Sequence, residues 1–464
     1  MIAAAYFALM SVVLIGMAIA GVLPAAMSLQ AMVTAAGLIG LFVALFASGV
    51  HVGAALLAMA FTCGIVLTDR PFWLFAGDVL WSPSTSFVFV AVPLFLLMGE
   101  LMLRTGLSER LYRALGLWFG RLPGGLLHTN IASCAVFSAV AGSSVATAAT
   151  MGSVALPYFE KSRYPQRLVL GSLAAGGALG NLIPPGITFI IYGLITETSV
   201  GDLYLAAIGP SILVVIAFTV VILHKSRGTR SAGGDAELIG IPTRGERLAS
   251  LLDLLPTGLL ILLVLGTIYA GIATPTESAA LGVVGALCMA LGARRLTLPI
   301  LRESLVATAR VTSMIGLILL GAFMLNYVLS SAGITQALSS ALASLPLPPW
   351  GVMLAIIGFY LAMGTFMEGI SMIVTTVPLL FPVVVALGYD PIWFGVVVTM
   401  LVEIAMISPP DGTVLYVLQG MRKRPGPITD VFAGVLPFMT AYIACVLVLL
   451  VVPGIATWLP NALR

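Results

Sequence analysis

The chain has 464 residues, of which 60% are hydrophobic and only 8% are charged. Its mean hydropathy of +1.14 lies outside the range of soluble globular domains. The net charge of +3 is spread along short loops and is not gathered on one face, which argues against a nucleic-acid partner. We therefore expect an all-α polytopic membrane protein that binds no nucleic acid.

The N-terminal apolar run from Ile2 to Val22 has neither a positive n-region nor an AxA-like cleavage site. It is therefore interpreted as a retained membrane span and not as a signal peptide. Apolar runs of membrane-spanning length predict the other simple spans. These lie near 31–48, 51–68, 86–103, 203–223, 253–271, 277–293, 311–330 and 432–457.

Two further regions, 127–195 and 350–420, are too long and too interrupted for simple spans. Each contains an apolar stretch broken by glycine and hydroxyl residues, followed by a second stretch broken by a proline pair. Pro184 and Pro409, which open these pairs, are 225 positions apart, and other landmarks keep nearly the same offset. The pattern predicts a duplication with two re-entrant hairpins, 127–158 and 350–386, and two broken helices, 168–195 and 393–420.

The distribution of basic residues indicates that the two halves are inverted relative to each other, because cytoplasmic loops are enriched in Lys and Arg. Arg104, Arg110 and Arg113 follow span 86–103, whereas the corresponding segment 331–348 has no charge. The bias is reversed at 421–430, which is basic, while its counterpart 196–202 is not. This threading predicts a cytoplasmic N-terminus and a periplasmic C-terminus.

The predicted repeats divide the chain into four parts. Residues 1–85 form N-terminal scaffold spans, 86–223 the first repeat, 224–310 a cytoplasmic loop with central scaffold spans, and 311–457 the second repeat. Inverted repeats with broken helices are typical of secondary transporters, which bind their substrates where the repeats meet. A channel is the competing interpretation, but channels commonly build their pores from several subunits.

The hairpin tips are the first candidates for ion binding. The tips lie at Ala141 to Thr147 and at Gly364 to Gly369, where hydroxyls and bared carbonyls offer hard oxygen ligands. Close helix packing by small residues is the alternative explanation. Glu368 and Glu403 lie inside apolar runs, and one of them could serve ion coupling, although a salt bridge or a protonated structural acid is equally compatible with the pattern.

Two further acidic positions have different explanations. Asp411 follows the second proline pair and is either a cation or proton ligand at membrane depth or the cap of a half-helix, Gly412 to Gly420. Thr274 to Glu277 reads as a capping box.

The motifs GxSxG and HExxH are absent, as is a P-loop, so we expect no enzyme and no ATP hydrolysis. Transport would then draw on an ion gradient or a partner.

The chain contains, in this order, the motifs AGSSVATAAT, LGNLIPPGITFIIYG, TPTESAALG and ISPPDGT. Together they resemble the large membrane subunit of tripartite ATP-independent periplasmic (TRAP) transporters. The resemblance implies an elevator-type, sodium-coupled importer of small organic anions, often carboxylates or sugar acids, in the bacterial inner membrane. It also implies a small membrane subunit of about four helices and a periplasmic substrate-binding protein as partners. No cofactor is implied other than Na⁺ as coupling ion.

The same resemblance assigns candidate residues. Candidates for sodium binding are Gly142, Ser143, Ser144, Asn181 and Pro184 in the first half, and Gly364, Thr365, Glu368, Ser408, Pro409, Asp411 and Thr413 in the second. Candidates for substrate binding are Ser143, Thr147, Thr188 and Thr413. This chain departs from the family pattern at Ala141, Gly186 and Asp411, where the family usually has serine, serine and valine. The extra N-terminal span is a further departure.

Two alternatives to this function stay open. A stand-alone ion-coupled anion carrier of the same superfamily would share the inverted architecture. An intramembrane enzyme or an assembly scaffold would belong to a different class.

Overall fold

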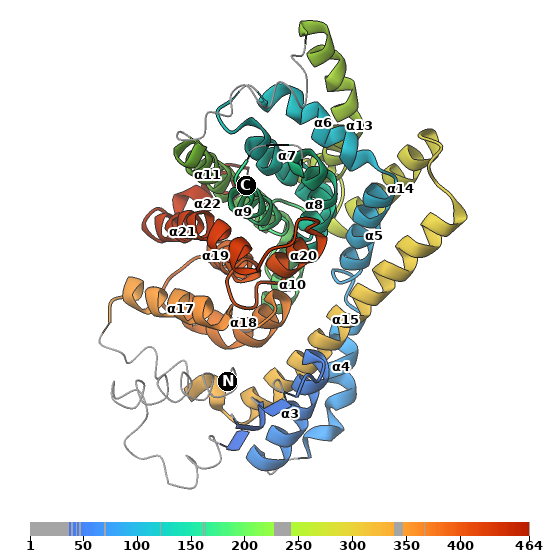
Figure 1. Cartoon of the computed structure of the whole chain (residues 1–464). Coiled ribbons are helices and arrows are strands. Elements are labelled where there is room, and N and C mark those ends of the chain that lie inside the picture. The colour runs from blue at the N-terminus through green and yellow to red at the C-terminus, as the bar shows by residue number, and fades with distance from the viewer. Residues whose placement is uncertain are drawn as a thin grey trace. The chain divides into compact units, whose positions relative to one another are not determined.

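The computed structural model describes residues 37–463, apart from 227–242, 338–346 and positions 39, 43, 46–47, 69–70, 121, 161, 163 and 366. Every regular element in this part of the chain is a helix (Figure 1). The predicted span from Ile2 to Val22 lies outside the described residues.

Six helices in the described part are long and apolar enough to cross a membrane. These are α11 (Val200–Ser226), α13 (Arg244–Tyr269), α14 (Pro275–Gly292), α15 (Leu298–Ser331), α18 (Gly369–Ala386) and α21 (Thr429–Val451). Other apolar helices are shorter and have 10–17 residues. The chain is thus an all-helical polytopic membrane protein.

In the two interrupted regions the helices end and begin again near the glycine and proline positions. In the first region, α7 (Gly125–Ala141) and α8 (Ser144–Glu160) form the hairpin, and α9 (Gln166–Gly177) and α10 (Ile187–Thr196) form the broken helix. In the second, α17 (Pro349–Met363) and α18 come first in the chain, and the broken helix is α19 (Pro391–Met406) with α20 (Thr413–Met421). The Pro184–Pro185 and Pro409–Pro410 peptide bonds are both cis.

The structure corrects the predicted span 432–457. Helix α21 ends at Val451, and a separate helix, α22 (Gly454–Leu463), follows Pro453. Proline lacks the amide hydrogen that would continue the helix, and this explains the break. The predicted span 311–330 is also only the C-terminal part of a 34-residue helix, α15.

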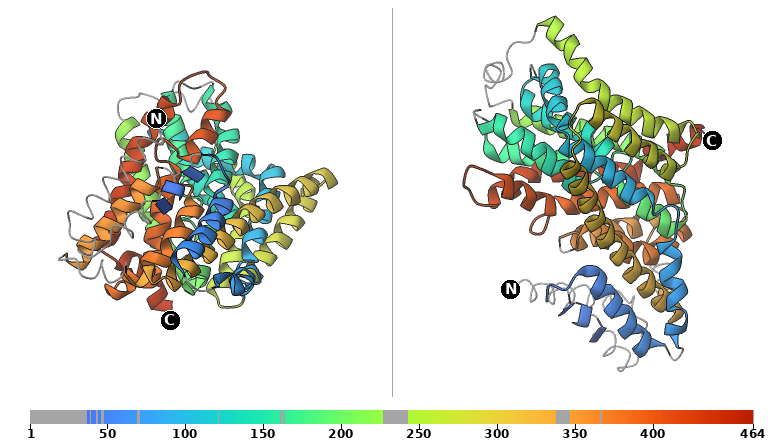
Figure 2. Two further views of the ribbon diagram at one scale, coloured as in Figure 1. Left: turned by 90° about the horizontal axis from the view of Figure 1, so that it is seen from below. Right: turned by 90° about the vertical axis from the view of Figure 1, so that its right-hand side faces the viewer.

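A second helix that the apolar runs did not reveal is α6 (Leu107–Phe119), which follows α5 (Ala91–Arg104). It is amphipathic, so it lacks the continuous apolar run of a span. It contacts α13 through an ion pair between Arg113 and Asp253 (3.6 Å) and a hydrogen bond from Trp118 Nε1 to Ser250 Oγ (3.2 Å). The N-terminal end of α13 projects beyond the helices beside it (Figure 2).

Residue contacts divide the chain into two compact units. The first consists of Met1–Ser86, Thr312–Ala355 and Val374–Tyr389, and the second consists of Phe87–Val311, Ile356–Ile373 and Asp390–Arg464. The first unit contains α3 (Val52–Leu67), the 3₁₀ turn η1 (Phe72–Leu74), α4 (Ala76–Ser84) and the second half of α15.

A small aromatic and aliphatic cluster holds the described part of the first unit together. Its buried members are Met59, Ala60, Cys63, Phe72, Met324 and Val328. Phe72 fills the space beside Gly64, where a Cβ atom would lie 2.5 Å from the phenyl ring. A Cβ on Gly321 of α15 would lie 2.7 Å from the carbonyl oxygen of Gly53, so α3 and α15 pack backbone to backbone.

The core of the second unit is built around α9, which packs most extensively against α21 and α7 (Figure 1). The contact between α9 and α21 depends on two glycines. A Cβ on Gly171 would lie 2.1 Å from the carbonyl oxygen of Gly434, and a Cβ on Gly434 would lie 2.0 Å from that of Arg167. Small residues allow this close approach of helices in membranes.

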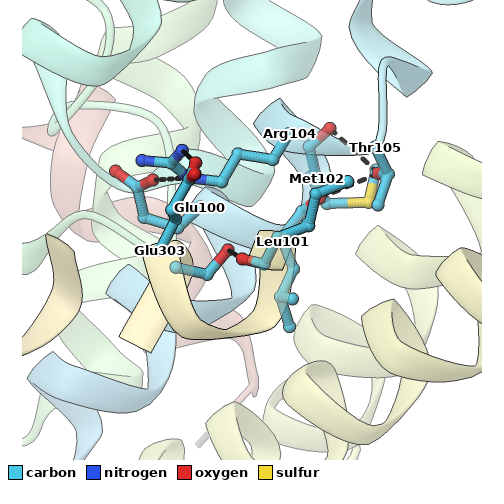
Figure 3. Close-up of polar contacts among 8 residues, drawn as sticks. Glu100, Leu101, Met102, Arg104, Thr105 and Glu303 are labelled. Atoms are coloured by element: carbon cyan, nitrogen blue, oxygen red, sulfur yellow. Dashed lines mark hydrogen bonds and ion pairs between the residues drawn. The ribbon is translucent and has the colours of Figure 1, made fainter. Parts of the chain in front are cut away.

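Charged side chains join the end of α5 to the first turns of α15, also within the second unit. Arg104 donates to Glu100 (3.0 Å) on its own helix and to Glu303 (2.6 Å) on α15, as Figure 3 shows. Arg295 donates to the carbonyl oxygen of Thr105 (3.2 Å). The adjoining helix α14 begins with the predicted capping box, in which Thr274 and Glu277 exchange hydrogen bonds.

Candidate functional site

The first hairpin turns at Gly142, between α7 and α8. Gly142 has a φ of 59°, which glycine adopts without the steric cost of a side chain. Its amide donates to the carbonyl oxygen of Ser138 (3.0 Å) and so ends α7. Ser143 is partly buried, whereas Ser144, the first residue of α8, is fully buried.

This hairpin tip contacts the break between α9 and α10 through main-chain atoms. The amide of Ile187 donates to the carbonyl oxygen of Gly142 (3.2 Å). A Cβ on Gly142 would lie 2.6 Å from the carbonyl oxygen of Pro185. Likewise, a Cβ on Gly180 would lie 2.3 Å from Cα of Ser144. The residue pattern that predicted an ion site therefore also produces a close backbone contact between tip and break.

A buried polar cluster lies at this contact and includes a carboxylate from α19. Ser144 Oγ lies 2.8 Å from Oε1 and 2.7 Å from Oε2 of Glu403, and can donate its proton to either. Asn181 Nδ2 donates to Oε1 of Glu403 (2.7 Å) and to Ser144 Oγ (2.9 Å). Glu403 is fully buried and Asn181 is 9% exposed. The cluster thus joins residues that are more than 200 positions apart in the chain.

Two threonines proposed for substrate binding lie beside this cluster. Thr188, at the start of α10, is fully buried, and its hydroxyl lies 3.5 Å from the carbonyl oxygen of Asn181. Thr147 lies one helical turn after Ser144 and is also fully buried. Its hydroxyl has no hydrogen-bond partner within the described part of the chain. A buried hydroxyl without a partner is costly, which makes Thr147 a candidate for contact with a ligand.

The second hairpin tip packs against the same helix, α19, but through apolar contacts. A Cβ on Gly364 would lie 2.5 Å from the Cβ of Ala405, and a Cβ on Gly369 would lie 2.5 Å from Cγ1 of Val402. Val402 and Ala405 flank Glu403 in sequence. Helix α19 therefore contacts both hairpin tips, the first through its carboxylate and the second through small and branched side chains.

The two polar candidates at the second tip make local hydrogen bonds. Thr365 Oγ1 donates to the carbonyl oxygen of Ala362 (2.7 Å) at the end of α17. Glu368 accepts from the amide (3.1 Å) and the hydroxyl (3.2 Å) of Ser371 in the first turn of α18. Glu368 therefore caps α18.

At the second break the candidate residues make only local hydrogen bonds among the described residues, unlike Ser144 and Asn181 at the first break. Ser408 accepts from the amide of Gly412 through its carbonyl oxygen (2.9 Å), while Thr413 Oγ1 contacts the sulfur of Met406 (3.4 Å). Tyr416 donates to the carbonyl oxygen of Pro410 (2.7 Å) and so crosses the break. Pro409 itself is partly buried.

The interpretation of Asp411 as a helix cap is wrong. Helix α20 begins at Thr413 with Gly412 as its N-cap, and no side chain caps it. Asp411 is exposed. The carboxylate lies two residues before the helix, outside the N-cap position from which a side chain would reach the first amides.

Sequence reasoning named Glu403 as an acid inside an apolar run that could serve ion coupling, but it did not assign Glu403 to a hairpin tip or break. Its helix α19 is apolar along its whole length, and all of its residues from Ile392 to Met406 are buried. The signal that could have identified it is this single carboxylate within an otherwise apolar helix. Its partners, however, lie in the other half of the chain.

The first tip and break together offer an arrangement that suits a small cation. The C-terminal ends of α7 and α9 and the N-terminal ends of α8 and α10 all lie within this segment. The oxygens available here are the carbonyls of Gly142 and Pro185, the hydroxyls of Ser144 and Thr147, and the carboxylate of Glu403. Unwound carbonyls and the negative ends of half-helices stabilise cations in transporters. The donor set is therefore compatible with an alkali cation.

Two solved transporter structures share the fold. The Alcanivorax borkumensis YdaH transporter superposes with a TM-score of 0.55 at 16% identity, covering 90% of this chain and 98% of that chain. Neisseria gonorrhoeae MtrF, described as one of a class of antimetabolite efflux pumps, superposes with a TM-score of 0.57 at 13% identity, covering 83% and 86%. The chain thus shares the all-helical, polytopic fold of these two proteins.

Sequence comparison identifies the family. The model for the DctM component of tripartite ATP-independent periplasmic transporters matches residues 38–455. The C4-dicarboxylate TRAP transporter large permease protein DctM of Pseudomonas aeruginosa is 33% identical over 82% of this chain and 88% of its own. The sialic acid large permease SiaM of Vibrio cholerae is 30% identical over 89% of this chain and 95% of its own. The ectoine large permease TeaC of Halomonas elongata is 30% identical over 80% and 85%.

This chain belongs to the DctM family of TRAP transporters and is a transporter permease, not an enzyme.

Proposed function

We propose that this chain is the large permease subunit of a sodium-coupled importer of small organic anions, carboxylates or sugar acids. The observation that carries the proposal is the contact of the first hairpin tip with the first break, where main-chain carbonyls and the side chains of Ser144, Asn181 and Glu403 converge. When bound, the coupling ion would supply the free energy of its gradient to transport. The relatives named for C4-dicarboxylates and sialic acid support the substrate class.

The proposed architecture is an inverted repeat that works as an elevator. Residues 86–223 and 311–457 form the two repeats, and 1–85 and 224–310 contribute the scaffold. The basic loops orient the protein with a cytoplasmic N-terminus and a periplasmic C-terminus in the bacterial inner membrane. Helix α19 contacting both hairpin tips agrees with a moving core that carries both halves of the site.

The proposed partners are a small membrane subunit of about four helices and a periplasmic binding protein that delivers the substrate. The family description, a tripartite transporter, supports both. The remaining sodium candidates belong to the second tip and break and are Gly364, Thr365, Glu368, Ser408, Pro409, Asp411 and Thr413. The proposed substrate contacts are Ser143, Thr147 and Thr188 from the first half and Thr413 from the second.

The test is uptake into proteoliposomes that contain this chain with the small subunit, supplied with the loaded binding protein. Uptake should occur with an inward sodium gradient and should fall to background when potassium or choline replaces sodium. Uptake that persists without any cation gradient would contradict the coupling. Uptake without the binding protein or small subunit would favour the stand-alone carrier, and no uptake under any condition would favour an enzyme or scaffold.

A further inference from the structure

The carboxylate of Glu403 lies at the first hairpin tip, and no positively charged side chain lies beside it among the described residues. Its carboxylate is fully buried and lies within hydrogen-bond distance of Ser144, the first residue of α8, and of Asn181 in the break. Both neighbours are neutral. They donate hydrogen bonds to the carboxylate, but they contribute no positive charge to balance it.

No basic side chain in the described part of the chain forms an ion pair with Glu403. The ion pairs there involve other carboxylates, those of Glu100, Glu160, Asp253, Glu303 and Asp430. The hydroxyl of Tyr442 on α21 is neutral and donates to the carbonyl oxygen of Ala178 (3.4 Å). A buried carboxylate without a counter-charge is strongly unfavourable, so the group either takes up a proton or binds a cation nearby.

The surroundings of Glu403 provide further oxygens but no further charge. The hydroxyl of Thr147, one turn beyond Ser144 on α8, is buried and has no hydrogen-bond partner among the described residues. The carbonyl oxygens of Gly142 and Pro185 lie at the same contact between tip and break. These groups could complete the coordination of a small ion, but only Glu403 could neutralise it.

We propose that Glu403 supplies the fixed negative charge of a monovalent-cation site at the first hairpin tip. The inference rests on the proposed sodium coupling and specifies which group balances the charge of the ion. Helix α19 belongs to the second half of the chain, so each half would contribute to this site: oxygen ligands from the first and the charge from the second. The carboxylate would then share Ser144 and Asn181 with the bound ion.

Thermal unfolding of the purified full-length chain tests this without any transport assay. The protein in nanodiscs is heated in sodium, potassium or choline chloride at constant ionic strength, and the sodium dependence of the Tm yields an apparent Kd. We expect sodium to raise the Tm of the wild type. In Glu403→Gln the sodium-free Tm should be retained and the apparent Kd for sodium should rise at least tenfold, because the amide keeps the shape and hydrogen bonds without the charge.

Glu109→Gln is the matched control, since Glu109 is an exposed carboxylate on α6, and its sodium response should equal that of the wild type. A Kd in Glu403→Gln within twofold of the wild type would overturn the inference, because the carboxylate would then serve only as a structural link. If Glu403→Gln does not fold, the sodium affinity of Glu403→Asp tests the inference instead. It keeps the charge but shortens the reach, so the Kd should rise three- to tenfold, and an unchanged Kd would overturn the inference.

Failure of this inference and failure of the proposed function have different signatures. If Glu403→Gln retains both the sodium response and binding-protein-dependent uptake, only the role of Glu403 is wrong. If the wild type shows no uptake with all partners under any gradient, the proposed function is wrong. A wild type that takes up substrate but shows no sodium-dependent Tm would overturn the cation site itself.

Discussion

Gly180 of the first break lies directly against Ser144 of the first hairpin tip. A Cβ atom on Gly180 would be 2.3 Å from Cα and 2.4 Å from the amide nitrogen of Ser144. Neither atom belongs to a flexible side chain, so the clash could be relieved only by moving the hairpin tip away from the break. The hydrogen bonds that link Ser144 to Asn181 and Glu403 depend on the same separation.

We therefore expect Gly180→Ala to destabilise the protein by about 1–3 kcal/mol, the usual cost of overpacking. It should also abolish any sodium-dependent rise in Tm, because the tip no longer reaches the break. Gly258→Ala is the control, since Gly258 lies within α13 with nothing within 4 Å of the added methyl group. Thermal unfolding of both variants checks the prediction, and an equal Tm for the two would contradict it.

A second prediction concerns Arg422, which follows α20 and contacts one residue from each of the two predicted repeats. Its side chain is only 4% exposed and donates to Gln166 (2.7 Å) and Asp430 (3.1 Å). Arg422→Ala leaves Gln166 without this donor and Asp430 with Arg167 as its remaining ionic partner, so we expect a loss of about 1–3 kcal/mol. Denaturant titration in detergent measures the change.

The neighbouring Lys423 provides the control for this charge removal. It pairs with Glu160 at 3.3 Å, but its side chain is 70% exposed. Lys423→Ala should therefore change stability by less than about 1 kcal/mol, as exposed pairs do. Equal losses in the two variants would show that burial of Arg422 does not matter.

The capping box at the start of α14 allows a third prediction. Thr274 accepts from the amide of Glu277 (3.3 Å), while Glu277 accepts from the amide of Thr274 (2.8 Å). Thr274→Ala should cost about 1 kcal/mol, and Thr274→Ser should restore most of it because the hydroxyl is retained. Thermal unfolding of the two variants is the measurement. A serine variant as unstable as the alanine variant would show that packing of the threonine methyl group, and not the cap, is responsible.

The fourth prediction addresses the contact between α9 and α21. A side chain at Gly171 would overlap the carbonyl oxygen of Gly434, since even a Cβ would lie 2.1 Å away. Gly171→Val should therefore reduce the yield of folded, monodisperse protein in size-exclusion chromatography severalfold. Gly420→Ala, where nothing lies within 4 Å, should leave the yield unchanged. Normal yield of Gly171→Val would mean that the two helices separate without cost.

Local signals in the sequence predicted much of this fold. Glycine and proline act on the backbone where they stand, so the turn at Gly142 and the break at Pro184 could be located without knowing their neighbours. The capping box of α14 is equally local. Helix α6 was not predicted because its apolar residues lie on one face only. They therefore form no continuous apolar run of the kind that indicates a membrane span.

The polar cluster could not be predicted in the same way. Ser144 and Glu403 are 259 positions apart, and only the packing of α19 against the first hairpin tip brings them together. The sequence indicates that Glu403 is unusual but offers no means of choosing its partner. Conversely, Asp411 stands in a position where a cap is plausible, and the structure shows that the helix begins two residues later.

The interlocked backbones of α9 and α21 have a consequence for spectroscopy. At Gly171 and Gly434, carbonyl groups of one helix lie against the main chain of the other. No side chains separate the two helices there, so neither helix can shift along the other without a backbone clash. Spin labels attached to the outer faces of these two helices should therefore report one constant distance in every functional state. Such a pair would serve as an internal ruler against which displacements elsewhere in the protein can be calibrated.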